Sequence, residues 1–171
     1  LLRNADLALY GAKADGRRTY RFFEAGMDER ARARRKLELD LRQAIVDGDL
    51  EVHFQPIVDI ESGRINCCEA LLRWQHSERG MIPSTEFIPI AEETGLINQL
   101  GQWVLSTACT EAVNWPDHVR VAVNVSPVQV RRDDLLLRVR QMLAATGLPA
   151  QALELEITES IFLADSEANL A

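Results

Sequence analysis

Residues 119–158 read VRVAVNVSPVQVRRDDLLLRVRQMLAATGLPAQALELEIT, and this stretch indicates the class of fold. The apolar run at 119–125 predicts a strand, and residues 132–146 predict a helix. A break at Gly147-Leu148-Pro149 separates that helix from a second apolar strand at 152–158. A strand, a helix and a strand in this order are typical of a parallel sheet.

The rest of the chain adds strands and helices around this unit. Two strands in succession, joined by a tight turn, predict a β-hairpin. The strands are nearly continuously apolar, as strands covered on both faces are, so the predicted fold class is α/β. The further predicted elements are a helix at 3–14, a strand at 19–23, a helix at 27–47, the hairpin strands at 51–60 and 65–74, a loop with Gly80 and Pro83, a helix at about 85–93 capped by Ser84 or Thr85, and a helix at about 96–114.

Charge is distributed unevenly along the chain, whose net charge is −7. Residues 1–36 hold ten basic and five acidic side chains, whereas residues 37–171 hold nine basic and twenty-one acidic ones. Such a switch indicates a domain boundary. The basic cluster from Arg30 to Lys36 is the one feature that suggests nucleic acid. It has no interleaved aromatic residues, so a solvated helix face is the favoured interpretation and no nucleic acid polymer is predicted as a partner.

The cysteines argue against a disulfide framework or a zinc site. Cys67, Cys68 and Cys109 are odd in number and lack C-x-x-C spacing, which predicts reduced, buried thiols. Charged residues interrupt every apolar run far short of the ~20 residues that a bilayer requires. The prediction is a globular domain with a substantial core.

Polar residues stand toward the ends of three of the predicted strands. They are Glu69, Asn124 and Glu156. Burying an unpaired carboxylate costs several kcal/mol, and Mg²⁺ or Mn²⁺ is a hard cation that takes such oxygen ligands. Ligands collect at the carboxyl ends of parallel strands, where the three side chains would converge. Taken singly, each residue is more simply a surface or structural one.

Arg73 shares a strand face with Glu69, because side chains alternate with a period of two. A guanidinium donates two parallel hydrogen bonds and therefore suits a phosphate. The pattern predicts a metal-binding carboxylate and a phosphate-binding arginine on the same side of one strand.

Residues 69–74, Glu-Ala-Leu-Leu-Arg-Trp, match the signature that names the EAL family. Roughly residues 37–171 resemble that family, and several independent blocks agree in order and spacing. These blocks are Phe54-Gln55-Pro56-Ile57-Val58, Pro83 with Glu86-Phe87-Ile88-Pro89, Ala91-Glu92-Glu93-Thr94-Gly95-Leu96-Ile97, Trp103-Val104-Leu105, Asn124-Val125-Ser126 with Gln129, and Leu155-Glu156-Ile157-Thr158-Glu159-Ser160.

The resemblance implies a TIM-like barrel that hydrolyses cyclic di-GMP to linear pGpG with Mg²⁺ or Mn²⁺. It assigns metal ligation to Glu69, Asn124 and Glu156, with Glu69 also counted as catalytic. Arg73 would contact a substrate phosphate, and Gln55 lies where the family approaches the nucleotide. Glu159 matches a carboxylate that steadies an active-site loop, a supporting catalytic role.

The beginning of the chain resembles the C-terminal end of a GGDEF diguanylate cyclase domain. Ala5-Asp6, Ala8-Leu9-Tyr10, Ala12-Lys13 and Gly16-Arg17-Arg18 carry this resemblance. The expected organisation is a GGDEF remnant at 1–25, a linker helix at 26–48 and the N-terminal half of an EAL domain at 49–171. We expect a longer parent with upstream GGDEF and sensory domains, a cytoplasmic location with possible anchoring to the inner membrane, and possible pairing of EAL domains as homodimers.

The family supplies further ligands, an adjacent Asp pair, a Lys and a Glu, that would follow Ala171. We therefore expect this chain by itself to be inactive, as a truncated barrel with open strand edges. The alternative is a degenerate EAL domain that binds cyclic di-GMP as a receptor without hydrolysing it.

Overall fold

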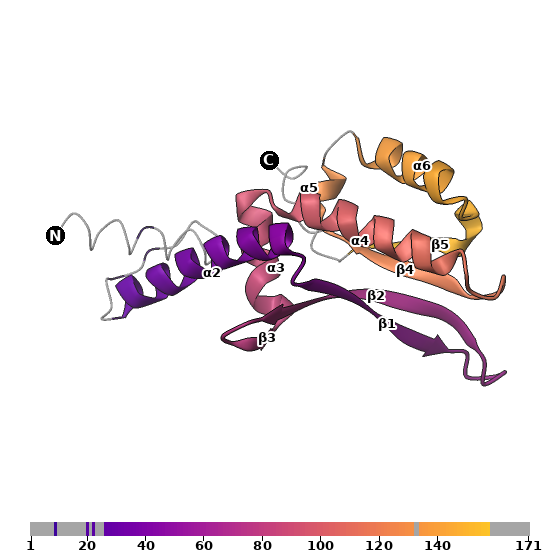
Figure 1. Cartoon of the computed structure of the whole chain (residues 1–171), viewed down its shortest axis with the longest axis horizontal. Coiled ribbons are helices and arrows are strands. Elements are labelled where there is room, and N and C mark those ends of the chain that lie inside the picture. Colours follow the sequence, from indigo (N-terminus) through magenta and orange to yellow (C-terminus); the bar gives the residue numbers. More distant parts are fainter. Residues whose placement is uncertain (1–8, 10–19, 21, 23–25, 132–133, 158–171) are drawn as a thin grey trace. The chain divides into compact units, whose positions relative to one another are not determined.

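The computed structural model describes Leu9, Tyr20, Phe22 and residues 26–131 and 134–157 (Figure 1). The helix predicted at 3–14 and the strand predicted at 19–23 lie outside the described residues, apart from those isolated positions. The chain divides into two compact units, with the boundary between Gln43 and Ala44. The sheet and the candidate site belong to the second of these units.

Helix α2 (Met27–Asp47) carries the basic cluster noted in the sequence. Three of its arginines pair with acidic neighbours three or four residues away: Arg32 with Asp28, and Arg35 and Arg42 with Glu38. Such pairing is typical of a solvated helix face, which agrees with the interpretation favoured above. Among the described residues, no helix is long and apolar enough to cross a membrane.

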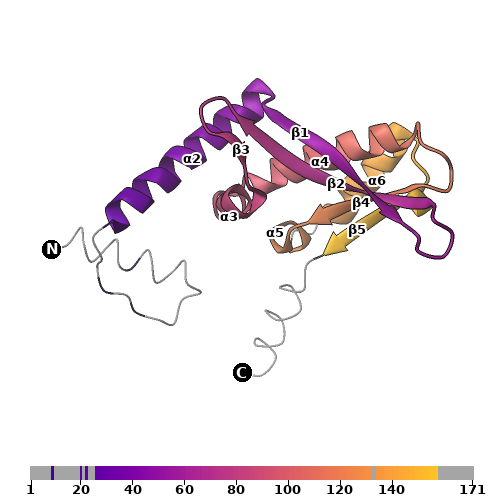
Figure 2. The same cartoon turned by 90° about the horizontal axis from the view of Figure 1, so that it is seen from below.

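The sheet begins with an antiparallel hairpin and continues with parallel strands. Its order is β1-β2-β4-β5, with the short β3 paired to β2 (Figure 2). β1 and β3 run antiparallel to β2, whereas β2, β4 and β5 are mutually parallel. The strands are β1 (Leu50–Val58), β2 (Ile65–His76), β3 (Gly80–Ile82), β4 (Arg120–Val125) and β5 (Leu153–Ile157).

Helices α4 and α6 cover one face of the parallel part of this sheet (Figure 1). Val121 and Val123 of β4 are buried on that face with Ala108 and Cys109 of α4 and Val139 of α6. This leaves the opposite face for the residues that alternate with them, among them Asn124. The helices after α2 are α3 (Ser84–Thr94), α4 (Ile97–Ala112), α5 (Pro127–Val130), α6 (Leu135–Thr146) and a short 3₁₀ turn (Ala150–Ala152).

Helix α3 is held on β2 by two buried aromatic rings. Trp74 and Phe87 are 1% and 0% exposed, and their rings meet edge to face with centroids 5.6 Å apart. Edge-to-face pairs add to the stabilisation that burial alone provides. Gly95, with φ of 78°, ends the helix in the left-handed conformation that glycine adopts readily.

Two local predictions were wrong. Pro83, in the extended conformation, precedes α3, so neither Ser84 nor Thr85 is its N-cap; proline suits this boundary because it restricts the backbone. Residues 80–82 form β3 rather than a loop. The turn before β3 closes because Nδ1 of His76 accepts hydrogen bonds from the backbone N–H groups of Glu78 and Arg79, at 3.0 and 3.3 Å.

The three cysteines are free thiols, as predicted. Cys67 and Cys109 are buried, whereas Cys68 is only partly so. Burial raises the pKa of the Cys109 thiol to about 11, which leaves it protonated near neutral pH. Cys109 is therefore an inert part of the core beneath β4.

Candidate functional site

The sheet aligns the predicted site residues in one row across four strands. Gln55 of β1 lies directly opposite Glu69 of β2, and Asn124 of β4 lies opposite Glu156 of β5. Between the two pairs, Nδ2 of Asn124 donates a hydrogen bond to Oε1 of Glu69 at 2.6 Å. Residues directly opposite have Cβ atoms about 5 Å apart, so the row brings together the side chains that the sequence singled out.

Strand register explains why Glu69 meets Asn124. β2 and β4 pair from Cys67 opposite Arg120 to Ala70 opposite Val123. Beyond Ala70, β2 continues to His76 without β4 and pairs with its antiparallel neighbours. Glu69 therefore stands near the end of the parallel segment, although it lies in the middle of the whole strand. Its direct partner, Ala122, has a small side chain, so Glu69 reaches Asn124 one step further along the same face.

Two carboxylates in this row repel each other. Burial raises the pKa of Glu156, and the negative charges of Glu69 and Glu154 raise it further. A neutral amide, Asn124, is the group that the structure places between Glu69 and Glu156. An arrangement of carboxylate and amide oxygens with excess negative charge suits a hard divalent cation.

The donor set fits Mg²⁺ or Mn²⁺ in kind, with two carboxylates and one amide oxygen. Within residues 26–131 and 134–157, no group of three or more His, Cys, Asp and Glu side chains is placed so that it could hold a metal ion by itself. Mg²⁺ is ordinarily held by one or two carboxylates and keeps waters or substrate oxygens on its other positions. Two carboxylates and one amide oxygen are a donor set of the kind that leaves such positions open.

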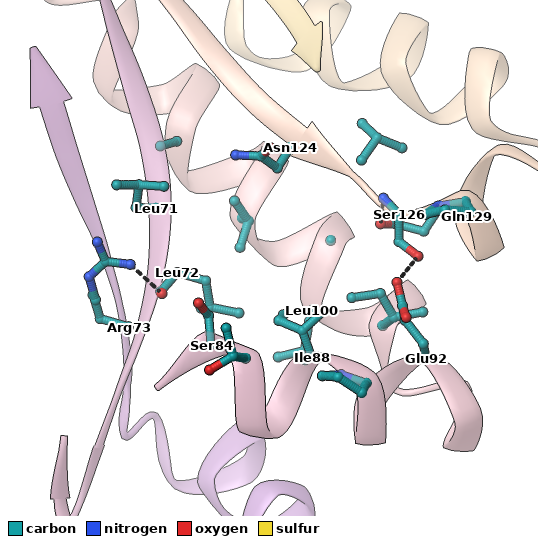
Figure 3. Close-up of a pocket in the computed structure, with 18 residues that line it drawn as sticks. Leu71, Leu72, Arg73, Ser84, Ile88, Glu92, Leu100, Asn124, Ser126 and Gln129 are labelled. Carbon is teal, nitrogen blue, oxygen red and sulfur yellow. Dashed lines mark hydrogen bonds between the residues drawn. The ribbon is translucent and has the colours of Figure 1, made fainter. Parts of the chain in front are cut away.

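Arg73 lies on β2 beyond Glu69, and its guanidinium turns back on its own strand. Nη1 of Arg73 donates to the backbone carbonyl of Leu72 at 3.0 Å (Figure 3). Arg73 and Asn124 both line the same cavity. The guanidinium has further N–H donors beyond the one that this bond uses. The remaining candidate, Glu159, lies outside the described residues.

The cavity, of about 430 Å³, opens where β2 and β4 separate. Most of its wall is apolar, from Ala70 and Leu72 of β2, Ile88 of α3, and Leu100 and Val104 of α4 (Figure 3). An apolar cavity with a few polar groups at its edge is a common form of small-molecule site. No local sequence pattern predicts this cavity, because it depends on where two strands separate.

The polar edge of the cavity includes a contact that sequence reasoning missed. Oγ of Ser126, just after β4, donates to Oε1 of Glu92 in α3 at 2.6 Å. Ser126 also caps the short helix α5 in a capping box with Gln129. The spacing Ser126-x-x-Gln129 is a readable signal for that cap, whereas no local pattern indicates the partner in α3.

Fold and site together define an α/β domain with carboxylate and amide side chains gathered on one face of its parallel strands. The chain belongs to the EAL domain family, whose profile matches residues 38–171.

Curated relatives match almost the whole chain. A signaling protein of uncharacterized function from Caulobacter vibrioides is 50% identical over 170 residues, which are 99% of this chain and 21% of that protein. The bifunctional diguanylate cyclase/cyclic di-GMP phosphodiesterase MucR from Pseudomonas aeruginosa is 42% identical over 174 residues, 99% of this chain and 25% of MucR. The cyclic di-GMP phosphodiesterase PdeR from Escherichia coli is 35% identical, with 100% and 26% covered. The chain spans about a fifth to a quarter of these relatives.

Solved structures give the same family. The MucR phosphodiesterase in complex with c-di-GMP superimposes with a TM-score of 0.72 and 40% identity, over 79% of this chain and 56% of that one. The EAL domain of FimX from Pseudomonas aeruginosa, bound to c-di-GMP, has a TM-score of 0.68 at 23% identity over 77% of this chain and 53% of its own. The FimX likeness concerns the fold alone.

Proposed function

We propose that the protein containing this chain is a cyclic di-GMP phosphodiesterase that acts in the cytoplasm and releases linear pGpG with the help of Mg²⁺ or Mn²⁺. The observation that supports this most is the row formed by Gln55, Glu69, Asn124 and Glu156 on one sheet face, with Asn124 bonded to Glu69. Relatives at 42% and 35% identity that carry the name of this activity support the choice of substrate.

In this proposal, Glu69, Asn124 and Glu156 hold the cation. A bound divalent cation supplies activation of water and stabilisation of phosphate oxygens in phosphodiester hydrolysis. Gln55, exposed beside Glu69, faces the nucleotide from β1. The apolar cavity of about 430 Å³, which Asn124 helps to line, takes an aromatic base, while Arg73 in its lining donates to a phosphate.

Product analysis of the complete protein tests the proposal. With Mg²⁺ or Mn²⁺, incubation with cyclic di-GMP is expected to yield pGpG, and a chelator is expected to stop the reaction. Binding of cyclic di-GMP without turnover would replace the enzyme with the receptor alternative. If the complete protein neither binds nor hydrolyses cyclic di-GMP, both the phosphodiesterase proposal and the receptor alternative are refuted.

Arg73→Ala is expected to raise the KM for cyclic di-GMP by about 10- to 100-fold, because a charge-assisted pair of hydrogen bonds to the phosphate contributes about 1.5–3 kcal/mol. Arg73→Lys should restore part of this loss, since an ammonium keeps the charge without the fork. Steady-state kinetics on the complete protein measure the change. Arg64→Ala, an exposed arginine at the β1–β2 turn, is the matched control. A KM for Arg73→Ala equal to that of the control would remove Arg73 from the substrate contacts.

A further inference from the structure

Glu92 of α3 makes a contact that none of the assigned roles uses. Its Oε1 accepts a hydrogen bond from Oγ of Ser126 at 2.6 Å, which joins two residues 34 positions apart in the chain (Figure 3). Both side chains are partly buried at the edge of the cavity. A carboxylate that accepts from a hydroxyl at this distance forms a charge-assisted hydrogen bond, which is stronger than a neutral one.

Ser126 is fully engaged where β4 ends. Its Oγ accepts from the backbone N–H of Val128 at 3.1 Å, and its own backbone N–H donates to Oε1 of Gln129 at 3.1 Å. The hydroxyl proton is what remains, and it is given to Glu92. Gly101 of α4 leaves the space in which the Gln129 side chain lies, because a Cβ at position 101 would come within 2.0 Å of Gln129 Nε2. The turn after β4 is thus held from α3 and α4 together.

Asn124 lies two residues before this turn, where β4 is paired with β5 but no longer with β2. Pairing of β4 with β2 ends at Val123, whereas pairing with β5 continues through Asn124 and Val125. Beyond Val123, where the pairing of β4 with β2 has ended, the contact of Ser126 with Glu92 ties this end of β4 to α3. Helix α3 is itself fixed to β2 by the Trp74–Phe87 ring pair. A closed path of contacts therefore runs from β2 through α3 and Ser126 to Asn124 and back to Glu69.

We infer that Glu92 is a positioning residue, which holds Asn124 against Glu69 through Ser126 and so preorganises the metal site. This inference rests on the proposed function, because it assumes that Glu69 and Asn124 bind the cation. Partners that orient metal ligands change metal affinity by about 10- to 100-fold when they are removed. Glu92 acts through the backbone of the β4–α5 turn rather than by touching metal or substrate.

Titration of the complete protein with Mn²⁺ in the absence of nucleotide, followed by calorimetry, tests the inference. Glu92→Ala is expected to weaken Mn²⁺ binding by about tenfold, and Glu92→Gln, whose amide oxygen still accepts from Ser126, should stay within about threefold of the wild type. Glu86→Ala, an exposed carboxylate of the same helix, should bind Mn²⁺ like the wild type. Unchanged Mn²⁺ affinity in Glu92→Ala, with KM for cyclic di-GMP raised, would overturn the inference and make Glu92 a substrate contact.

A double-mutant cycle gives a second measurement. Loss of Mn²⁺ affinity in Glu92→Ala/Ser126→Ala should be about that of Ser126→Ala alone, since the two side chains act through one contact; additive losses would contradict the inference. Thermal melting of each variant identifies those that are unfolded at the assay temperature; if Glu92→Ala is one of them, Ser126→Ala, which removes the same contact, carries the comparison, and Mn²⁺ affinity equal to that of the wild type would overturn the inference. A wild type that hydrolyses cyclic di-GMP while Glu92→Ala keeps its metal affinity refutes this inference alone. A wild type that binds no Mn²⁺ refutes the proposed function with it.

Discussion

Glu69→Ala is expected to lower kcat/KM for cyclic di-GMP by at least about 1000-fold in the complete protein, because a lost metal ligand removes on the order of 4 kcal/mol of transition-state stabilisation. The geometry gives a reason for so large an effect at this position. Glu69 is the carboxylate that contacts Asn124, and its strand partner on the other side is Gln55. Its removal would take away one ligand and the acceptor that orients a second.

Steady-state hydrolysis and a Mn²⁺ titration on the same preparations measure this change. Glu61→Ala is the matched control, because Glu61 is an exposed glutamate at the β1–β2 turn, outside the row. Glu69→Ala should lose both turnover and most of its metal affinity, whereas Glu61→Ala should keep both. Turnover of Glu69→Ala within tenfold of the wild type would show that Glu69 does not bind a metal needed for the reaction.

The largest expected effect on stability belongs to Phe87. Phe87→Ala should lower the free energy of unfolding of the domain by about 3–5 kcal/mol, because a cavity replaces the fully buried Phe87 ring and its pair with the Trp74 ring is lost. Urea unfolding followed by circular dichroism measures the shift. Met81→Ala in β3 is the control, as that side chain is 49% exposed and should change stability by less than about 1 kcal/mol.

A loss below about 1.5 kcal/mol for Phe87→Ala would mean that the surroundings collapse into the space or that α3 is held elsewhere. Phe87→Leu should lie between the wild type and alanine, because it refills part of the volume.

Sequence reasoning found the parallel unit and the site residues because both depend on local patterns. Apolar runs of strand length with a helix between them predicted β4, α6 and β5, and the structure shows all three. Costly polar residues in such runs identified Glu69, Asn124 and Glu156, which the sheet brings into one row. Their roles in binding metal remain a prediction, as does that of Glu159.

The features that sequence reasoning missed depend on contacts between distant segments. β3 has three residues and forms because β2 continues to His76 and offers it an edge, so no pattern of its own predicts it. The short helix α5 was likewise overlooked, although its capping box is visible in the sequence. The contact between Glu92 and Ser126 requires the folded position of α3, and the cavity requires the separation of β2 from β4.

In the proposed site, oxygens of Glu69, Asn124 and Glu156 surround one divalent cation. A crystal structure of the complete protein with Mn²⁺, with anomalous scattering recorded at a wavelength where manganese scatters strongly, locates this ion. We expect an anomalous peak about 2.0–2.5 Å from an oxygen of each of the three side chains. A crystal of active protein whose Mn²⁺ peak lies away from Glu69, Asn124 and Glu156 would contradict it.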